Sequence, residues 1–155
     1  MATIGAFGII FDADGRVLLC HRTDRDLWNL PGGTMESAEV PWETVVREVE
    51  EEVGVRVVIE QWSSVSFKPE NDDLVFTYIC RIVGGALRES SEADRIAYFP
   101  IDAIPENTSP RQVERIRHAA RDRVTCIVNV QSPTTPTVVA RVFSTQRESA
   151  DWPHL

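Results

Sequence analysis

The sequence has few cysteines and no long apolar run, and both absences argue against whole classes of protein. Its three cysteines, Cys20, Cys80 and Cys126, are scattered and share no metal-ligand spacing, so neither a disulfide framework nor a cysteine zinc site is expected. No apolar run is long enough to cross a membrane, and residues 1–16 lack the basic and apolar regions of a cleavable signal peptide. We therefore expect reduced thiols, a cytoplasmic location and no membrane partner.

Positive charge is also scarce. Sixteen lysine and arginine residues stand against 24 aspartate and glutamate residues, which gives a net charge of −8 at pH 7. Neutralising a phosphate backbone requires basic patches, so the composition argues against a long nucleic acid as a partner. Residues 111–123 are a local exception, with five arginines against Glu114 and Asp122, and we expect a solvated helix face there.

Apolar periodicity and turn signals predict strands mixed with two helices. The expected strands are residues 3–12, 17–20, 55–67 (one strand or two), 74–83 and 96–99. Helical spacing of apolar residues predicts helices at 41–53 and 110–122. The turn at 13–15 predicts that the first two strands form a hairpin. A chain of 155 residues with this mixture is expected to form one α/β sandwich with a full core.

A further β-prone region follows the second expected helix. Residues 125–130 and 137–143 are separated by the turn-rich segment QSPTTP, which predicts an appended hairpin. We expect a domain at 1–123 and an extension at 124–155 that belongs to the same compact unit and ends in a tail. Such a hairpin either covers the domain's own sheet edge or pairs with a second subunit in a homodimer.

Residues 33–55 carry the most specific pattern in the chain. They match G-x5-E-x7-R-E-U-x-E-E-x-G-U, where U is aliphatic. The matching residues are Gly33, Glu39, Arg47, Glu48, Val49, Glu51, Glu52, Gly54 and Val55. With average residue usage, the chance of this match in one window is on the order of 10⁻⁹.

The spacing within this pattern suits metal chemistry. On a helix, Glu48, Glu51 and Glu52 fall within an arc of about 100°. Carboxylates are the hard oxygen ligands that Mg²⁺ prefers, and a cation relieves the repulsion between like charges at this spacing. The apolar stripe expected to pack on a sheet is Trp42, Val45, Val46, Val49 and Val53. Pro41 suits the first turn of this helix, and Gly54 suits a left-handed C-cap.

The pattern resembles the signature of the Nudix, or MutT-like, hydrolases, with no departure at any of the nine positions. The resemblance implies an α/β/α sandwich with a mixed β-sheet and a catalytic loop–helix–loop. It also implies a metal-dependent enzyme in which Glu48, Glu51 and Glu52 hold Mg²⁺, with Mn²⁺ as a substitute. Arg47 is then expected to pair with Glu39 and so to hold the loop against the helix.

Other site residues are weaker expectations from the same resemblance. A backbone carbonyl before the helix can bind metal, and Gly32 is the candidate. A further carboxylate is expected as base or ligand; Glu92 is the first choice, and the alternatives are Glu89, Asp72 and Asp73. Arg22 is a candidate for binding phosphate, although an exposed ion pair is an equal alternative. Trp28 and Phe67 are candidates for an aromatic platform under a base.

The motif predicts the reaction and leaves the substrate open. Nudix members hydrolyse a nucleoside diphosphate linked to a second group, so a nucleotide-type small molecule is the expected partner. Pro69 favours ADP-ribose or a nucleotide sugar, whereas WNLPGG at 28–33 favours the nucleoside triphosphates of nucleotide-pool clean-up. Alternatives of other classes are a domain that senses a nucleotide without cutting it and a structural domain with an acidic helix; the complete glutamate set argues against the first, and the second leaves the spacing unexplained.

Overall fold

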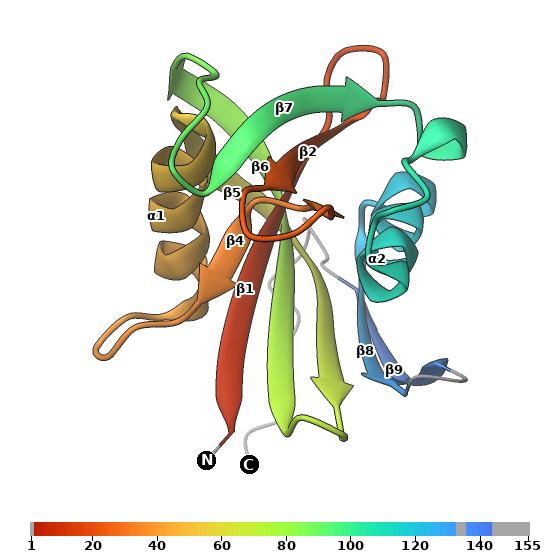
Figure 1. The fold of residues 1–155 in the computed structure, drawn as a ribbon. Helices are drawn as coiled ribbons and strands as arrows, with labels where there is room; N and C mark the ends of the chain where they lie inside the picture. Colours follow the sequence, from red (N-terminus) through yellow and green to blue (C-terminus); the bar gives the residue numbers. More distant parts are fainter. Residues whose placement is uncertain (1, 133–135, 144–155) are drawn as a thin grey trace, which may run out of the picture.

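The computed structural model describes residues 2–132 and 136–143 (Figure 1). The strands are β1 (Thr3–Ile10), β2 (Val17–Arg22), β3 (Trp28–Asn29), β4 (Gly32–Thr34), β5 (Val55–Lys68), β6 (Asp73–Gly85), β7 (Ala93–Phe99), β8 (Thr125–Gln131) and β9 (Pro136–Phe143). The helices are α1 (Pro41–Val53), the 3-10 helix η1 (Ile101–Ala103) and α2 (Pro110–Arg121). The expected helices at 41–53 and 110–122 are therefore confirmed.

The main sheet is mixed and has the strand order β4-β1-β6-β5-β8-β9. β1 runs parallel to β6, β5 and β6 form a long antiparallel hairpin, and β8 runs parallel to β5. Helices α1 and α2 lie on opposite sides of this sheet (Figure 1). The predicted α/β sandwich with a mixed sheet is confirmed.

The predicted hairpin of the first two strands is wrong. Beyond one isolated bridge between Phe11 and Val17, β2 pairs with β3 and β7 in a separate three-stranded sheet, β3-β2-β7. The turn forms as expected, since the Asp12 carboxylate accepts bonds from the backbone N–H of Asp14 and Arg16. β2 lies between the two cores and is buried on both faces. A strand that only extended β1 in a hairpin at the sheet edge would be exposed to solvent.

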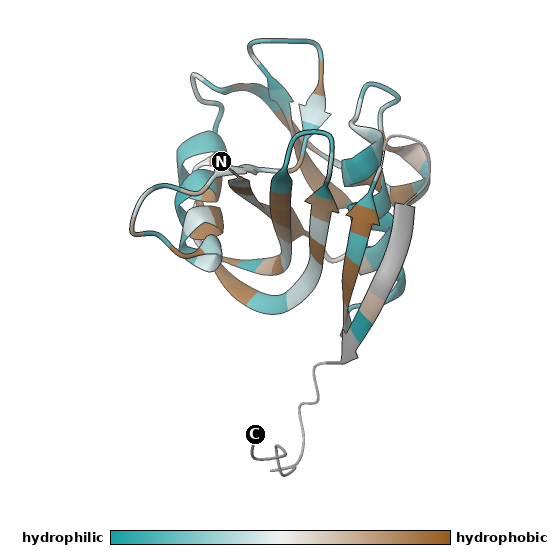
Figure 2. Ribbon diagram, turned by 90° about the horizontal axis from the view of Figure 1, so that it is seen from below, coloured by the Kyte–Doolittle hydropathy of each residue, from teal (hydrophilic) through white to brown (hydrophobic). Residues whose placement is uncertain are grey.

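Two apolar clusters fill the space on either side of the main sheet. Helix α1 contributes Val45, Val49 and Val53 to the first cluster, and α2 contributes Ile116 and Ala119 to the second. Figure 2 shows both apolar and polar segments on the strands of the sheet. Among the described residues, no helix is long and apolar enough to span a membrane.

Helix α1 begins and ends where the sequence predicts. Pro41 is its first residue, and Gly54 closes it with φ of 83°, in the left-handed region. The apolar stripe was predicted one residue too wide, because Trp42 is 53% exposed. Trp42 lies in the first turn, where the helix has not yet reached the sheet that Val45, Val49 and Val53 cover.

Helix α2 differs more from its prediction. Ile116 is buried as expected, but Arg115 is only 5% exposed and His118 only 7%. The expectation of a fully solvated arginine face is therefore wrong at Arg115, which faces β8 and bonds to Gln131. The neighbouring strand makes the difference, because β8 covers a side of α2 that would otherwise be open.

The predicted C-terminal hairpin is present. β8 and β9 pair antiparallel, and β8 joins the main sheet through the pairs Ser64–Ile127 to Phe67–Val130. The hairpin thus extends the main sheet at its β5 edge; the boundary at residue 123 stays a prediction. The expected tail lies outside the described residues. Cys20, Cys80 and Cys126 are free and buried, as predicted.

Candidate active site

Three carboxylates meet in a cleft of about 530 Å³. Oxygen atoms of Glu48, Glu52 and Glu92 all lie within 4.8 Å of one another. Glu48 and Glu52 lie one turn apart on α1, and Glu92 comes from the loop immediately before β7. Glu92 is exposed, whereas the other two are not. Glu92 is therefore the most solvent-exposed member of the cluster.

Burial raises the pKa of the two helix carboxylates. Desolvation is the main cause for Glu52, and the charge of Glu48 adds to it. The pKa of Glu48 is also raised by burial, against the lowering effect of Arg47. Two adjacent carboxylates in such a place favour either a shared proton or a bound cation. The arrangement is consistent with a cation site.

The motif glycines bring the backbone close to these carboxylates. A Cβ at Gly33 would lie 2.6 Å from Glu48 Oε1, and one at Gly32 would lie 2.6 Å from Phe7 Cδ1. Both residues belong to β4, which pairs with β1. The backbone of Gly32 also bonds to the Glu52 carboxylate and lowers its pKa against the larger effect of burial. Any side chain at these two positions would displace either β1 or the carboxylate cluster.

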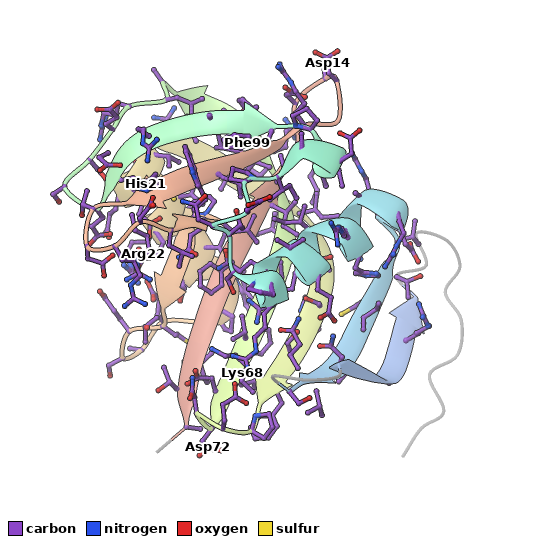
Figure 3. All side chains as sticks on the ribbon, turned by 45° about the vertical axis from the view of Figure 1, so that its right-hand side comes forward. Asp14, His21, Arg22, Lys68, Asp72 and Phe99 are labelled. Atoms are coloured by element: carbon purple, nitrogen blue, oxygen red, sulfur yellow. The ribbon has the colours of Figure 1, made fainter. Side chains whose placement is uncertain are left out.

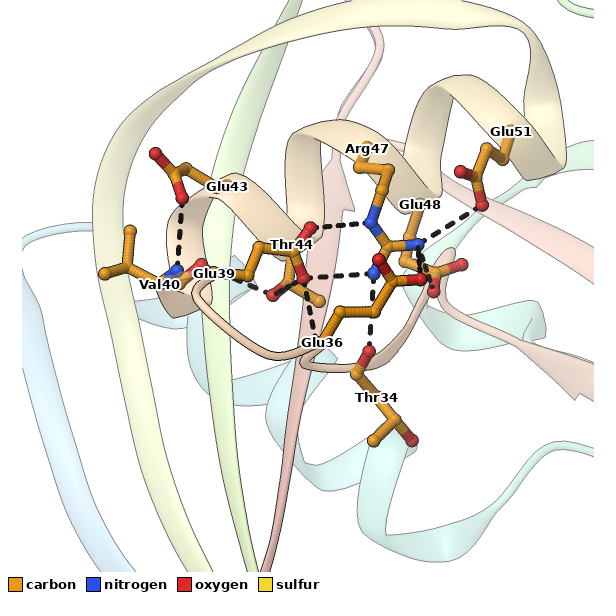
Figure 4. Close-up of polar contacts among 9 residues, drawn as sticks. All are labelled: Thr34, Glu36, Glu39, Val40, Glu43, Thr44, Arg47, Glu48 and Glu51. Carbon is orange, nitrogen blue, oxygen red and sulfur yellow. Dashed lines mark hydrogen bonds and ion pairs between the residues drawn. The ribbon is translucent and has the colours of Figure 1, made fainter.

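Arg47 joins the loop to the helix (Figure 4). Its Nε and Nη2 atoms donate to the two carboxylate oxygens of Glu39, at 2.6 and 3.1 Å. Its Nη1 atom donates to Glu48 Oε1 at 3.0 Å and to Glu51 Oε2 at 3.3 Å. The two bonds from Arg47 to Glu39, with bonds from the backbone N–H of Glu36 and the hydroxyl of Thr44, lower the pKa of Glu39 to about 2. The expected pairing of Arg47 with Glu39 is present.

The predicted glutamate trio divides in the structure. Glu48 and Glu52 face the cleft, but the Glu51 side chain is 54% exposed and bonds to Arg47. Glu51 does not line the cleft, and Glu92 lies there instead. Among the three alternatives to Glu92, only Asp73 lines the cleft.

Two cations line the same cleft. Arg22, at the end of β2, pairs with Asp24 through Nη2–Oδ2 at 2.6 Å. Lys68 ends β5 and pairs with Asp73 at 3.2 Å. Figure 3 shows them well apart, with Lys68 near the β5–β6 turn. Sequence reasoning missed Lys68; the one available signal was that it is the only lysine in the chain.

The two predicted aromatic platforms lie elsewhere. Trp28 is 7% exposed and packs edge-on against His21 and Phe99. A ring that is buried in the core in this way is not available to stack on a base, so the prediction for Trp28 is wrong. Phe67 is 36% exposed, but it does not line the cleft, because alternate residues of β5 face opposite sides of the sheet.

A family model described as the NUDIX domain matches residues 1–119 of this chain. The chain belongs to the Nudix family. This Nudix chain is 33% identical to a MutT-like protein of Streptomyces ambofaciens over 104 residues, which cover 67% of the chain and 68% of the relative. It is 30% identical to a putative 8-oxo-dGTP diphosphatase of Bacillus subtilis, covering 79% of the chain and 85% of the relative.

A solved Nudix-fold structure is also similar. It is an ADP-ribose pyrophosphatase from Streptococcus suis, with a TM-score of 0.67 and 25% identity, covering 84% of this chain and 98% of that one. The chain is thus a Nudix hydrolase, an enzyme of a family that acts on nucleotide-type small molecules. Nudix hydrolases generally use a divalent metal, and the carboxylate cluster is compatible with one.

Proposed function

We propose that this Nudix hydrolase cleaves the phosphoanhydride bond of a nucleoside diphosphate linked to a second group, and that ADP-ribose or a nucleotide sugar is its substrate. The observation that carries the proposal is the cluster of Glu48, Glu52 and Glu92 in a cleft that also presents Arg22 and Lys68. Such a cleft combines a site for a divalent cation with positively charged side chains that bind phosphate oxygens.

Mg²⁺ fits the cluster, with Mn²⁺ as a substitute, because all three donors are carboxylates. The nearest sulfur is that of Cys20, whose thiol donates to Glu52 Oε2 at 3.5 Å. Burial raises the pKa of that thiol, so it offers no thiolate to a softer metal. When bound, the divalent cation neutralises phosphate oxygens and acidifies water.

The protein's own residues divide the remaining tasks. Glu48, Glu52 and Glu92 hold the cation, and Gly32 brings its backbone carbonyl to the same place. Glu52 accepts a proton from the attacking water, because its carboxylate lies in the cluster beside the cation; Glu92 is the alternative base. Glu51 supports the cluster through its bond to Arg47. Arg22 and Lys68, at separate places in the cleft, offer positive charge to the anionic substrate.

Support for ADP-ribose or a nucleotide sugar comes from the turn beside the cleft. Pro69 directly follows Lys68, in the short turn between β5 and β6, so the proline fixes the backbone next to a cleft cation. The similar solved structure is named an ADP-ribose pyrophosphatase. Hydrolysis of ADP-ribose would release AMP and ribose 5-phosphate.

A (d)NTP pyrophosphatase is the second candidate. The observation that favours it is the Bacillus subtilis relative, named a putative 8-oxo-dGTP diphosphatase, which is similar over 79% of this chain. A triphosphate would yield a nucleoside monophosphate and pyrophosphate, so the products separate the two candidates.

The test is a product assay over ADP-ribose, nucleotide sugars, dinucleoside polyphosphates and all (d)NTPs, with Mg²⁺, Mn²⁺ or EDTA. Glu52→Gln is expected to reduce kcat by about 100-fold or more. Glu50→Gln is the matched control, because Glu50 lies on the same helix and is exposed; its activity should stay near that of the wild type. Arg22→Ala and Lys68→Ala should each raise KM by roughly three- to tenfold.

Each outcome has a clear consequence. Turnover of ADP-ribose or nucleotide sugars with little turnover of (d)NTPs supports the first substrate proposal. Preference for a (d)NTP would support the second candidate function, with the same catalytic residues. Binding without turnover would move the protein to the nucleotide-sensing class, and near-normal activity of Glu52→Gln would overturn the proposed site.

A further inference from the structure

A second cavity of about 280 Å³ lies between α2 and β8. Among the described residues, none that lines it also lines the catalytic cleft. Three arginines reach it from separate elements: Arg115 and Arg121 from α2, and Arg141 from β9. The cavity is therefore a separate place on the molecule with an unusual concentration of positive charge for an acidic protein.

Arg115 is the unusual residue in this cavity. It is 5% exposed, and its Nε and Nη2 atoms both donate to Gln131 Oε1, at 3.0 and 2.7 Å. No carboxylate among the described residues lies within ion-pair distance of it. Burial lowers its pKa to about 10, so it remains charged at neutral pH. A buried charge without a counter-ion is strongly unfavourable, and an anion in the cavity would remove that cost.

Two further buried polar atoms lack partners within the described part of the chain. Ser64 is 3% exposed and Asn129 is 7% exposed, and neither Ser64 Oγ nor Asn129 Oδ1 has a hydrogen-bond partner there. Both residues line the cavity. Asn129 Nδ2 donates to Glu114 Oε1 at 3.3 Å, which fixes the amide so that its oxygen is the free atom. The site thus needs a ligand with both acceptors and a donor.

We propose that this cavity binds free inorganic phosphate, which keeps a P–OH group at neutral pH. The phosphate oxygens accept bonds from Arg115 and Ser64, and the P–OH group donates to Asn129 Oδ1. A water molecule satisfies the polar atoms and leaves the charge of Arg115 unbalanced. Sulfate balances the charge but has no proton to donate at neutral pH, so the site distinguishes two anions of similar size.

The acidic residues of the lining do not take the place of the anion. Glu114 is engaged by Asn129, and the Asp122 carboxylate accepts bonds from the backbone N–H of Val124 and Thr125. His118 bonds to the backbone oxygen of Thr125 at 2.9 Å. Three arginines against two carboxylates leave the lining with a net positive charge.

The test measures the melting temperature of the full chain against inorganic phosphate, at constant ionic strength and in EDTA to weaken binding in the catalytic cleft. Ligand binding to the folded state should raise Tm with phosphate concentration. We expect a larger rise with phosphate than with sulfate. A parallel titration with glycerol 3-phosphate, whose second pKa is about 6 and which therefore mostly lacks a P–OH group at neutral pH, should give a smaller rise than free phosphate.

Variants assign the effect to the cavity. Arg115→Met should abolish the phosphate-dependent rise, and Arg121→Ala should weaken binding by up to roughly tenfold. Arg117→Ala is the matched control, because Arg117 is an exposed arginine of the same helix that does not line the cavity. If Arg115→Met fails to fold, Ser64→Ala replaces it and should weaken binding several-fold. Amide NMR shifts on adding phosphate should concentrate in residues 112–131.

Three results would overturn the proposal. The first is the absence of any rise in Tm beyond that given by sulfate. The second is equal weakening by Arg117→Ala and Arg121→Ala, which would show a diffuse charge effect. The third is loss of binding in Arg22→Ala, which would place the anion in the catalytic cleft.

Discussion

The Glu52 carboxylate lies beside that of Glu48. This arrangement favours the binding of a cation but lowers the stability of the fold when no cation is bound. Replacing Glu52 by Gln keeps the shape and an acceptor for the Cys20 thiol, and it removes the repulsion from Glu48. We therefore expect Glu52→Gln to raise the free energy of unfolding in EDTA by about 1 kcal/mol. Urea unfolding of both proteins in EDTA measures this difference.

Adding Mg²⁺ should reverse the order, because only the wild type has the full ligand set and gains stability from binding. The control is Glu50→Gln, which should follow the wild type with and without Mg²⁺. Equal stabilisation of wild type and Glu52→Gln by Mg²⁺ would place the cation elsewhere.

The guanidinium of Arg47 should not be replaceable by an amine. Arg47 meets both oxygens of Glu39 and also reaches Glu48, a fork that lysine cannot reproduce. We expect Arg47→Lys to lower the free energy of unfolding by about 1–2 kcal/mol, a modest figure because the side chain is partly exposed. The urea midpoint should fall while the m-value stays constant. An unchanged midpoint would contradict this role.

At the residue scale, the sequence predicted what one helix determines and missed what distant segments bring. Glu48 and Glu52 were found because their spacing places them on one face. The same spacing gave Glu51 an equal place, but a helical wheel cannot show that Glu51 is exposed and bonds to Arg47 in the structure, so its role as a cation ligand stays a prediction. Glu92 and Lys68 reach the cleft through the topology of β7 and the β5–β6 hairpin, and only Glu92 was anticipated.

The end of α1 depends on a backbone shape that few residues adopt. Gly54 has φ of 83°, and a Cβ there would lie 2.6 Å from the backbone oxygen of Ala86. Gly15 has a similar φ of 77° with nothing within 4 Å of its Cβ position. We expect Gly15→Ala to lower the free energy of unfolding by about 1 kcal/mol, because alanine is strained at this positive φ. Gly54→Ala should cost clearly more, because the clash adds to that strain.

The comparison is made by thermal and urea unfolding of the two variants side by side. Equal losses would mean that the chain after α1 moves aside without cost, and the close contact with Ala86 would then have no energetic importance.

His21 links three elements and gives the fold a pH dependence. Its ring nitrogens contact Asp94 at 2.7 Å and Asp26 at 2.8 Å, so β2, the loop after it and the start of β7 meet there. The bond to Asp26, followed by that to Asp94, raises the pKa of His21 above 6.5. The stabilisation is complete below the unfolded pKa near 6.5 and is lost as pH rises through the higher folded value.

The measurement is the free energy of unfolding of wild type and His21→Gln across pH 5.5–9. The free energy of unfolding of the wild type should exceed that of the variant most at the acidic end of this range. The difference should become smaller as the pH rises. A difference that is constant over this range would show that the His21 contacts do not depend on its charge.

Local signals predicted the elements better than their pairing. Pro41 and Gly54 mark both ends of α1, and each acts through its own backbone. The sequence of residues 55–67 allows one strand or two. The structure has one strand, β5, and its pairing with β6 shifts register at points that include Ile59/Gln61 and Trp62/Ser64. The pairing of β2 with β7 could not be read in this way, because it joins segments more than seventy residues apart and depends on how two cores share one strand.

The whole molecule depends on the C-terminal hairpin more than an appended segment would suggest. β8 covers β5 at Ser64–Phe67, Thr125 accepts the His118 bond, and Gln131 accepts both bonds from Arg115. We therefore propose that the hairpin is an integral part of the domain. The family match ends at residue 119, so the β8 partners in these contacts lie beyond the part of the chain that the family pattern describes.

A chain ending at Arg123 should therefore lose stability. Removing β8 would expose a sheet edge and leave buried polar groups of α2 without partners, each at a cost of about 1–3 kcal/mol. Circular dichroism should show a lower Tm and a partly lost transition. A truncated chain with the wild-type Tm would show that the hairpin is dispensable to the fold.

A homodimer must be tested with the full chain, because the C-terminal hairpin supports the fold. An association of the truncated chain would report its exposed edge and would say nothing of the native contact, so the full chain is the right sample. Light scattering over a range of concentrations distinguishes a mass near 17.4 kDa from twice that value. We propose a dimer through the outer edge of β9, because that strand ends the sheet order and an open edge favours pairing. A monomeric mass at every concentration would reject the dimer and leave the hairpin with its role inside one chain.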